Sequence, residues 1–219
     1  HVLTQPKLRI KPDVFATNRS KESYEKYGGY LPIYEKENAF EYIDDFDQIA
    51  IIDADIYIRP NARNIFDQMN CKCAFGAVCE REMDIQDWYK GKIINYSKMQ
   101  YGLLHSNTMD FKPNELGFEF FNMGMIVINS QIFKPYLNGQ TPRQFLERME
   151  FKDFVDGQGA WKWSTDQTLL NYFLKKYSVP TKHINPTFNG LFTAVNNIKE
   201  CDFVHFFLKD KLPNKGENV

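Results

Sequence analysis

The sequence predicts an α/β protein whose central sheet is mostly parallel and is flanked by helices. Short, continuous apolar runs at 48–53 (QIAIID) and 118–129 (FEFFNMGMIVIN) have the composition of strands that are covered on both faces. Helical periodicity occupies the intervals between such runs, most clearly at 164–177 (STDQTLLNYFLKKY). Strands that alternate with helices are typical of sheets built from parallel β-α-β units.

The first third of the chain supplies several further elements. Ser20 is suited to cap a helix that Gly28 would end, and the apolar residues at 39, 40, 43 and 46 follow helical spacing. The expected elements are a short strand at 11–18, helices at 20–27 and 34–46, the strand at 48–53 in the centre of the sheet, a short helix at 61–69, and a strand at 73–78.

The remaining two thirds continue the alternation after a stretch of weak periodicity. Residues 81–117 are polar and aromatic and predict a mixed insertion of helix and loop. Thr141 followed by Pro142 indicates a helix start, because proline fits the first helical position. The elements expected after the insertion are the strand at 118–129, helices within 130–149, the helix at 164–177 entered through Ser164 or Thr165, an edge strand within 181–190, and a final strand within 201–207.

Size and composition predict a single folded domain. The chain has 219 residues, of which 43% are hydrophobic, and this is enough apolar surface to bury a substantial core. A net charge of −1 gives no footprint for nucleic acid or an acidic membrane surface. No apolar run approaches the roughly 18 residues that a transmembrane helix needs. We therefore expect an intracellular, cytoplasmic protein without a transmembrane segment.

The cysteines and isolated histidines predict no metal site. Cys71, Cys73 and Cys79 form a C-x-C-x5-C pattern, and Cys201 is distant. This spacing is a poor match to zinc-binding motifs and favours reduced thiols in core strands. His105 and His183 fit no motif, and we expect solvated or structural roles for them.

Asp53 and Asp55 follow the apolar run at 48–52 directly and form a D-x-D pair. Two like charges so close together require a positive partner, and a hard divalent cation such as Mn²⁺ or Mg²⁺ suits oxygen ligands. In open α/β sheets, ligands bind beyond the carboxyl ends of the strands, where this pair lies. Two alternatives remain open: a solvated turn, or an aspartyl-phosphate phosphatase in which the first Asp is the nucleophile.

Four blocks of the sequence, in order, resemble nucleotide-sugar glycosyltransferases with the A-type, Rossmann-like fold. They are most similar to glycosyltransferase family 8 and the glycogenin-like enzymes. The strand followed by DADIYIRPNARNIFD (53–67) resembles the D-x-D region of that family, and FFNMGMIVIN (120–129) resembles its FNSGVMVIN strand. DQTLLN (166–171) is similar to DQDxLN, and HFFLKDKLP (205–213) is similar to the C-terminal HxxGxxKPW.

The resemblance implies a metal-dependent hexosyltransferase that uses a nucleoside-diphosphate sugar, most simply a UDP-sugar, and a glycan or glycoprotein acceptor. Asp53 would contact the ribose or the metal, Asp55 would bind the metal, and His205 would be the third protein ligand. The implied cofactor is Mn²⁺ or Mg²⁺, which would neutralise the departing diphosphate. Retention of anomeric configuration is the expectation from the family. Inversion stays open, and Asp166 would then be a candidate base.

Further site residues follow from the same resemblance. Lys211, with Lys209 as its competitor, would add positive charge near the diphosphate, and Arg81 would contact the donor. Asn122, Asp166 and Gln167 would face the donor sugar or the acceptor. For Asp166 a role as helix N-cap or first-turn acid is the structural alternative.

The chain also departs from the family pattern. Met123 stands where the family has Ser or Thr, and Leu208 stands where it has Gly. The stretch before Asp53 is short for the family, so we expect a shortened N-terminal unit or one module of a longer polypeptide. A catalytically inactive sugar-binding module is the remaining alternative to an enzyme.

Overall fold

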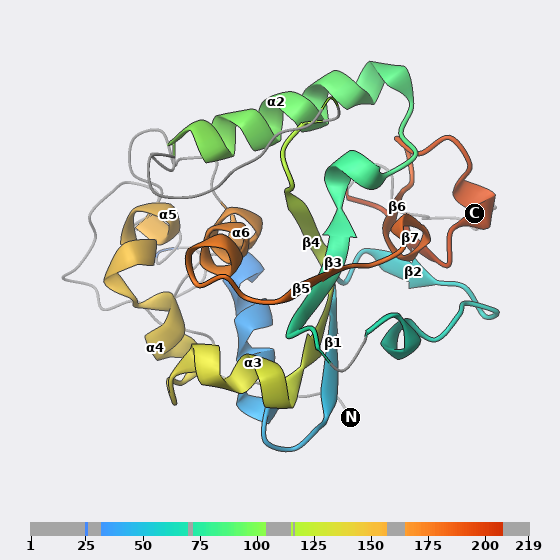
Figure 1. Ribbon diagram of the computed structural model, residues 1–219. Helices are drawn as coiled ribbons and strands as arrows, with labels where there is room; N and C mark the ends of the chain where they lie inside the picture. The colour runs from blue at the N-terminus through green and yellow to red at the C-terminus, as the bar shows by residue number, and fades with distance from the viewer. Residues whose placement is uncertain are drawn as a thin grey trace.

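The computed structural model describes residues 25, 32–69, 72–103, 115, 117–156 and 165–207. The strand expected at 11–18 and the helix expected at 20–27 lie outside the described residues, apart from the helical position 25. Helices and sheets are mixed, as Figure 1 shows, so the predicted α/β class is confirmed. Among the described residues, no helix is long and apolar enough to cross a membrane.

The main sheet has four described strands in the order β1-β4-β3-β5. Three of them, β1, β3 and β5, run in one direction, and β4 runs against them. The sheet is therefore mixed, because the reversed strand lies between β1 and β3 and makes both of those pairings antiparallel. The strands are β1 (Gln48–Ile52), β3 (Phe75–Cys79), β4 (Phe121–Asn129) and β5 (Thr181–His183).

One sequence expectation for this sheet differs from the described strand order. The apolar run at 48–52 was expected to form a central strand, but β1 lies at the end of the described strand order and most of its side chains are only partly buried. The central strands are β3 and β4, and all five residues of β3 are buried. An apolar run reports local burial, whereas the order of strands depends on pairing between distant segments.

A second sheet has the described order β2-β7-β6, with β7 pairing antiparallel to β2 and parallel to β6. Its strands are short: β2 (Ile56–Ile58), β6 (Gly190–Leu191) and β7 (Phe203–His205). The final strand expected at 201–207 thus forms, but in this second sheet. Because β2 begins three residues after Asp53, the segment with both aspartates joins the two sheets.

Two helices begin where local signals predict, whereas the helices expected at 34–46 and 61–69 are 3₁₀-helices with other bounds, η2 and η3. In α4, the Thr141 side chain accepts a hydrogen bond from the Gln144 N–H, and the Gln144 side chain accepts one from the Thr141 N–H. In α6, Thr165 is the N-cap and accepts from the Gln167 N–H. The helices are η2 (Pro32–Tyr42), η3 (Ile65–Gln68), η4 (Glu80–Glu82), α2 (Asp87–Leu103), α3 (Ser130–Leu137), α4 (Pro142–Leu146), η6 (Met149–Phe151), α5 (Lys152–Asp156), α6 (Asp166–Lys176), η8 (Pro186–Asn189) and η9 (Ile198–Glu200).

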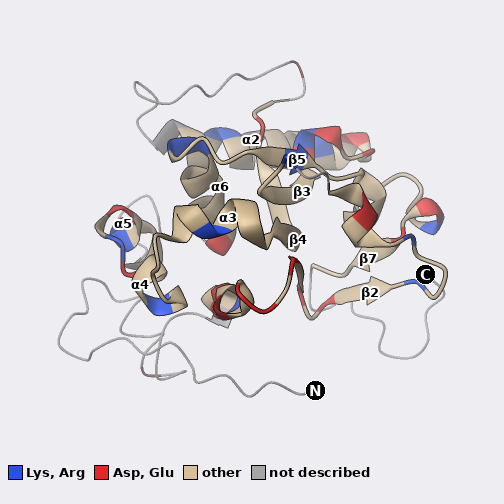
Figure 2. Cartoon of the chain, turned by 60° about the horizontal axis from the view of Figure 1, so that its bottom comes forward, with Lys and Arg blue, Asp and Glu red and all other residues tan. Residues whose placement is uncertain are grey.

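Two apolar clusters cover the two faces of the four-stranded sheet. One cluster packs the sheet against η2, α3, α4, α5 and α6, and it is rich in phenylalanine. The other packs the sheet against β6, β7 and η8. In Figure 1 the helices α3 to α6 accordingly gather on one side of the sheet, and the short strands β2, β6 and β7 lie on the other. Positions of both charge signs are scattered over the described elements, as Figure 2 shows.

The central strand β4 contains a bulge that shapes the site. Its pairing with β3 is regular from Phe75↔Ile128 to Ala77↔Ile126, and then shifts so that Val78 pairs with Asn122. Residues 123–125 therefore have no partners on β3. Bulges of this kind bend a strand and redirect its side chains and carbonyls.

Candidate active site

A cavity of about 520 Å³ opens where the two sheets meet. The carboxyl ends of β1 and β3, the start of the antiparallel β4 and the start of α6 all lie at this place. Elements that are far apart in the sequence therefore line the cavity. Its place agrees with the rule that ligands of α/β proteins bind beyond the carboxyl ends of the strands. The polar lining residues are Lys36, Asp53, Asp55, Glu80, Tyr89, Lys92, Tyr96, Asn122, Thr165, Asp166, Gln167 and His205.

The structure brings Asp53, Asp55 and His205 together in this cavity. One ligand atom from each residue lies within 4.8 Å of the others. The His205 Nε2 atom is 3.4 Å from Asp55 Oδ1 and 3.9 Å from Asp53 Oδ2. The antiparallel pairing of β2 with β7 sets these distances, because Ile56, the residue after Asp55, is the partner of His205.

The other side of the His205 ring is held by a chain of buried amides. His205 Nδ1 lies 2.8 Å from Asn189 Oδ1, and Asn189 Nδ2 donates to Asn122 Oδ1 at 2.7 Å. Asn122 Nδ2 in turn donates to Glu80 Oε1 at 3.0 Å. An amide oxygen can only accept, so the Nδ1 atom carries the proton. The lone pair of the neutral ring is then on Nε2, which faces the two aspartates.

Gly124 in the bulge allows His205 to lie this close. A Cβ atom added at Gly124 would lie 2.4 Å from His205 Cε1 and 2.7 Å from Nδ1. The Gly124 N–H also donates to Asn122 Oδ1 at 3.0 Å, and its carbonyl accepts from the Asp53 N–H at 2.8 Å. The glycine therefore bonds two of the predicted site residues, Asp53 and Asn122, through its backbone and leaves room for a third, His205.

Lys36, from η2, lies between two carboxylates of the cavity. Its Nζ atom is 2.6 Å from Asp166 Oδ2 and 2.9 Å from Asp53 Oδ1, and it donates to the Met123 carbonyl at 2.9 Å. Three acceptors around one ammonium satisfy all of its protons. The bulge residue Met123 contributes through its carbonyl, so the identity of its side chain does not affect this contact.

Burial and these ion pairs shift the proton affinities of the site. Burial raises the pKa of Asp166, although the charge of Lys36 opposes the increase. Burial alone would lower the pKa of Lys36, but the charges of Asp166 and Asp53 outweigh burial and raise it. Burial alone would also raise the pKa of Asp55, but His205 and Lys36 hold it below its usual value. At neutral pH the cavity therefore holds charged groups of both signs.

Glu80 anchors two of the predicted sugar-facing side chains. It follows β3 directly, and its Oε1 atom accepts from Asn122 Nδ2 and from Gln167 Nε2, the latter at 2.9 Å. Burial raises the pKa of the Glu80 carboxyl, although both donors oppose the shift. Asn122 and Gln167 therefore line the cavity in orientations that one buried carboxylate fixes.

The structure places the other predicted site residues as follows. Asp166 is the first residue of α6, but Thr165 is the N-cap, and the Asp166 side chain is paired with Lys36. Arg81 does not line the cavity; its Nη1 atom donates to the Gly117 carbonyl at 3.4 Å. Lys209 and Lys211 lie outside the described residues.

Sequence reasoning missed Lys36, Glu80 and Asn189. A signal for Glu80 was available, because it follows an apolar strand at the same sheet edge as Asp53. Lys36 lies in a helix with many charged residues, and nothing in its spacing distinguishes it from its neighbours. Asn189 ends the short helix η8, and only the tertiary fold brings it to His205.

The arrangement fits a hard divalent cation. Two carboxylates and an imidazole lone pair are ligands that Mn²⁺ accepts, and they converge from two chain segments, one that follows β1 and one at the end of β7. Lys36 forms an ion pair with the Oδ1 atom of Asp53, and the Oδ2 atom of Asp53 lies on the His205 side. The cavity beside this group is large enough for part of a nucleotide sugar.

No protein-family model matches this chain, and no characterised protein matches it in sequence. Solved structures do match. A galactosyltransferase, LgtC, in complex with donor and acceptor sugar analogues, superposes with a TM-score of 0.50 at 16% identity, over 86% of this chain and 64% of that chain. Mouse xyloside xylosyltransferase 1, in its apo form, matches with a TM-score of 0.47 at 13% identity, over 90% of this chain and 73% of that chain.

The first of these matches shows a shared fold. At 16% identity it shows nothing finer, and the chain spans less than two thirds of the length of that galactosyltransferase. The architecture described above is thus the A-type fold found in glycosyltransferase structures.

Proposed function

We propose that this protein is a metal-dependent glycosyltransferase that moves a hexosyl group from a nucleoside-diphosphate sugar, UDP-linked in the simplest case, to a hydroxyl acceptor on a glycan or glycoprotein. The observation that carries the proposal is the convergence of Asp53, Asp55 and His205 in a cavity of an A-type fold. In this proposal those three residues hold Mn²⁺ or Mg²⁺. The cation would neutralise the charge that develops on the departing diphosphate.

The amide chain behind His205 supports the metal-binding role. A histidine that binds a metal through one nitrogen normally donates its other N–H to a fixed acceptor. Asn189 is such an acceptor, and Asn122 and Glu80 extend the chain to a buried carboxylate. The ring is thus oriented with its Nε2 atom toward the two aspartates.

Three further polar residues that line the cavity are suited to hold the transferred sugar. Asn122, Asp166 and Gln167 offer amide and carboxylate groups that pair well with sugar hydroxyls, and Glu80 and Lys36 fix their orientation. Preorganised side chains of this kind lower the entropic cost of aligning donor and acceptor. The buried pairing of Asp166 with Lys36 makes Asp166 a positioning group, and we propose retention of configuration, as the family resemblance implies.

A donor-hydrolysis panel tests the proposal. UDP-, GDP- and dTDP-sugars are incubated with the full chain, with and without Mn²⁺, and release of the nucleoside diphosphate is followed. We expect metal-dependent release with at least one donor. The release should fall by at least about 100-fold in Asp55→Asn, which keeps the shape of the side chain but removes its charge.

A matched control separates this effect from general loss of stability. Asp87 lies in the first turn of α2, its side chain is almost fully exposed, and it is outside the cavity, so Asp87→Asn should keep the full rate. Equal rates for Asp55→Asn and the wild type would contradict the proposal. Phosphate release from sugar phosphates would favour the aspartyl-phosphate phosphatase instead. Donor binding without turnover would favour a sugar-binding module.

A further inference from the structure

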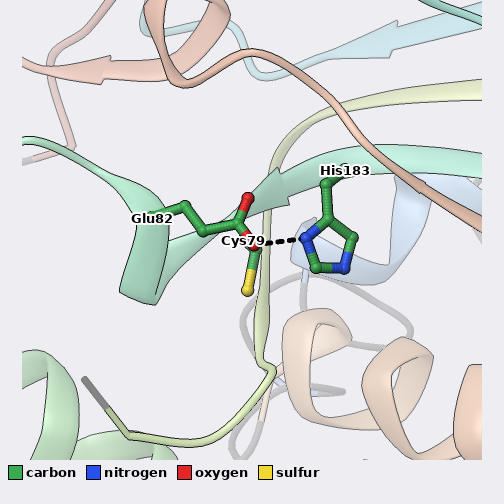
Figure 3. Close-up of side chains that lie close together, drawn as sticks. All are labelled: Cys79, Glu82 and His183. Carbon is green, nitrogen blue, oxygen red and sulfur yellow. Dashed lines mark hydrogen bonds and ion pairs between the residues drawn. The ribbon is translucent and has the colours of Figure 1, made fainter. Parts of the chain in front are cut away.

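A second group of metal-ligand side chains lies outside the cavity described above. Cys79 ends β3, Glu82 ends η4, and His183 ends β5, which pairs parallel to β3. A sulfur, a carboxylate oxygen and a ring nitrogen from these residues lie within 4.8 Å of one another. Figure 3 shows the three side chains close together, with the Glu82 carboxylate next to the His183 ring.

We propose that Cys79, Glu82 and His183 form a binding site for a thiophilic divalent cation of the Zn²⁺ type. This site is separate from the proposed Asp53 site and does not depend on the sugar-transfer proposal. Sulfur, nitrogen and oxygen ligands together are the set that Zn²⁺ accepts, whereas Mn²⁺ and Mg²⁺ prefer oxygen. The two sites thus differ in the cation that they select.

The environment of His183 supports this assignment. Its Nε2 atom lies 2.7 Å from Glu119 Oε1, and its Nδ1 atom contacts Glu82. A carboxylate that fixes one ring nitrogen while the other faces the ligand set is the arrangement found behind metal-bound histidines. Glu119 also forms an ion pair with Lys175, so its negative charge is balanced without a bound metal ion.

The ligand charges also fit a divalent ion. The Cys79 thiol is fully buried, so it would bind a cation as a thiolate whose charge the cation itself balances. One thiolate, one carboxylate and a neutral imidazole around Zn²⁺ give a group with no net charge, which removes the cost of burying an unpaired ion.

The three proposed ligand side chains can adjust to the geometry of a bound Zn²⁺ ion. Tetrahedral Zn²⁺ separates its ligand atoms by about 3.3–3.8 Å, given bond lengths of about 2.0–2.3 Å. The sulfur, oxygen and nitrogen atoms lie within 4.8 Å of one another, and the Glu82 carboxylate would have to withdraw from the His183 ring to admit a cation. Glu82 is partly exposed, so it can move, and water can complete the coordination from the solvent side.

The site would link two neighbouring strands next to the cavity. Glu80, which holds Asn122 and Gln167, lies in the sequence between the ligands Cys79 and Glu82. A cation that joins this segment to β5 would restrict the movement of Glu80. We therefore expect the bound cation to raise the melting temperature of the whole chain, because a ligand that binds only the folded state stabilises it.

Cobalt binding tests the site directly, because Co²⁺ bound to a thiolate gives a charge-transfer absorption in the near ultraviolet. The chelator-treated full chain is titrated with Co²⁺, and the band is then displaced with Zn²⁺. We expect the band in the wild type and its loss in Cys79→Ser. Cys73→Ser is the matched control: Cys73 precedes β3, its thiol contacts the Thr181 carbonyl, and its loss should leave the band intact.

Two further variants make the result specific. His183→Gln should weaken Co²⁺ binding by at least about 10-fold, and Asp55→Asn should not change the band. The His183 variant also covers the case in which Cys79→Ser does not fold. Absence of the band in the folded wild type would overturn the proposal. So would a band in Cys79→Ser or His183→Gln that equals the wild-type band in intensity and in Co²⁺ affinity. In that case His183 would be read as an imidazolium that bridges Glu82 and Glu119.

Discussion

Replacing Asn189 with alanine should weaken divalent-cation binding at the Asp53 site, although Asn189 is not itself a proposed ligand. The substitution removes the acceptor 2.8 Å from His205 Nδ1 and the donor 2.7 Å from Asn122 Oδ1. Asn189 is fully buried, so its partners would be left in a dry environment. The His205 ring would then be free to rotate or to exchange tautomer.

The expected magnitude follows from these two contacts. Loss of a partner behind a metal-bound histidine costs about 10–100-fold in metal affinity. This corresponds to about 1.4–2.7 kcal/mol of binding free energy. The free energy of unfolding without metal should fall by about 1–3 kcal/mol, because the buried His205 N–H loses its only acceptor among the described residues.

Free Mn²⁺ measured by electron paramagnetic resonance during a titration gives the affinity, and urea unfolding gives the stability. Asn185→Ala is the matched control. Asn185 caps the same short helix η8 and accepts from the Thr187 N–H at 3.0 Å, so its loss should cost about 1 kcal/mol of stability without changing Mn²⁺ affinity. Equal Mn²⁺ affinity in Asn189→Ala and Asn185→Ala would refute the reasoning.

Two further variants test the bulge and the buried cation. Gly124→Ala should lose Mn²⁺ binding and about 1–3 kcal/mol of stability, because its Cβ would meet the His205 ring. Gly91→Ala is the control and should be neutral or stabilising, because a Cβ at this position in α2 has open space around it. Equal effects of the two substitutions would exclude the clash with His205. Lys36→Met should destabilise the protein by about 3–5 kcal/mol at pH 7, because it leaves Asp166 buried without its cation. Burial already raises the pKa of Asp166, so protonation relieves the unpaired charge as pH falls. Urea unfolding should therefore show a smaller loss at pH 5 than at pH 7, and an equal loss at both would count against this account.

The elements that the sequence predicted well depend on short-range physics. Thr141 and Gln144 form the helix start because a threonine oxygen and a glutamine side chain can satisfy free N–H groups three residues apart. The helix at 166–176 begins at its Thr165 cap for the same reason. The strands at 75–79 and 121–129 follow from uninterrupted apolar runs, and they lie at the centre of the sheet. Each of these features needs only neighbouring residues.

Pairing between distant segments was not predictable from such signals. The reversed direction of β4, the place of β1 at the end of the described strand order and the placement of β7 in a second sheet all depend on contacts between residues far apart in the sequence. The apolar run of β4 is continuous, as expected for a strand covered on both faces, and this pattern did not reveal that β4 runs antiparallel to β1 and β3. The bulge at 123–125 likewise depends on a register shift against β3.

The residues of the candidate site also fall into two groups, those that the sequence indicated and those that only the tertiary structure revealed. By itself the sequence determined the α/β class, the acidic pair Asp53 and Asp55 at a strand end, and, through a family resemblance, His205 as their companion. Only the tertiary structure decided that Lys36 lies between Asp53 and Asp166, and that Asn189 holds the His205 ring. The physical reason is that a strand end places a side chain through local geometry, whereas a buried polar partner is selected by whichever segment the fold brings within hydrogen-bond distance.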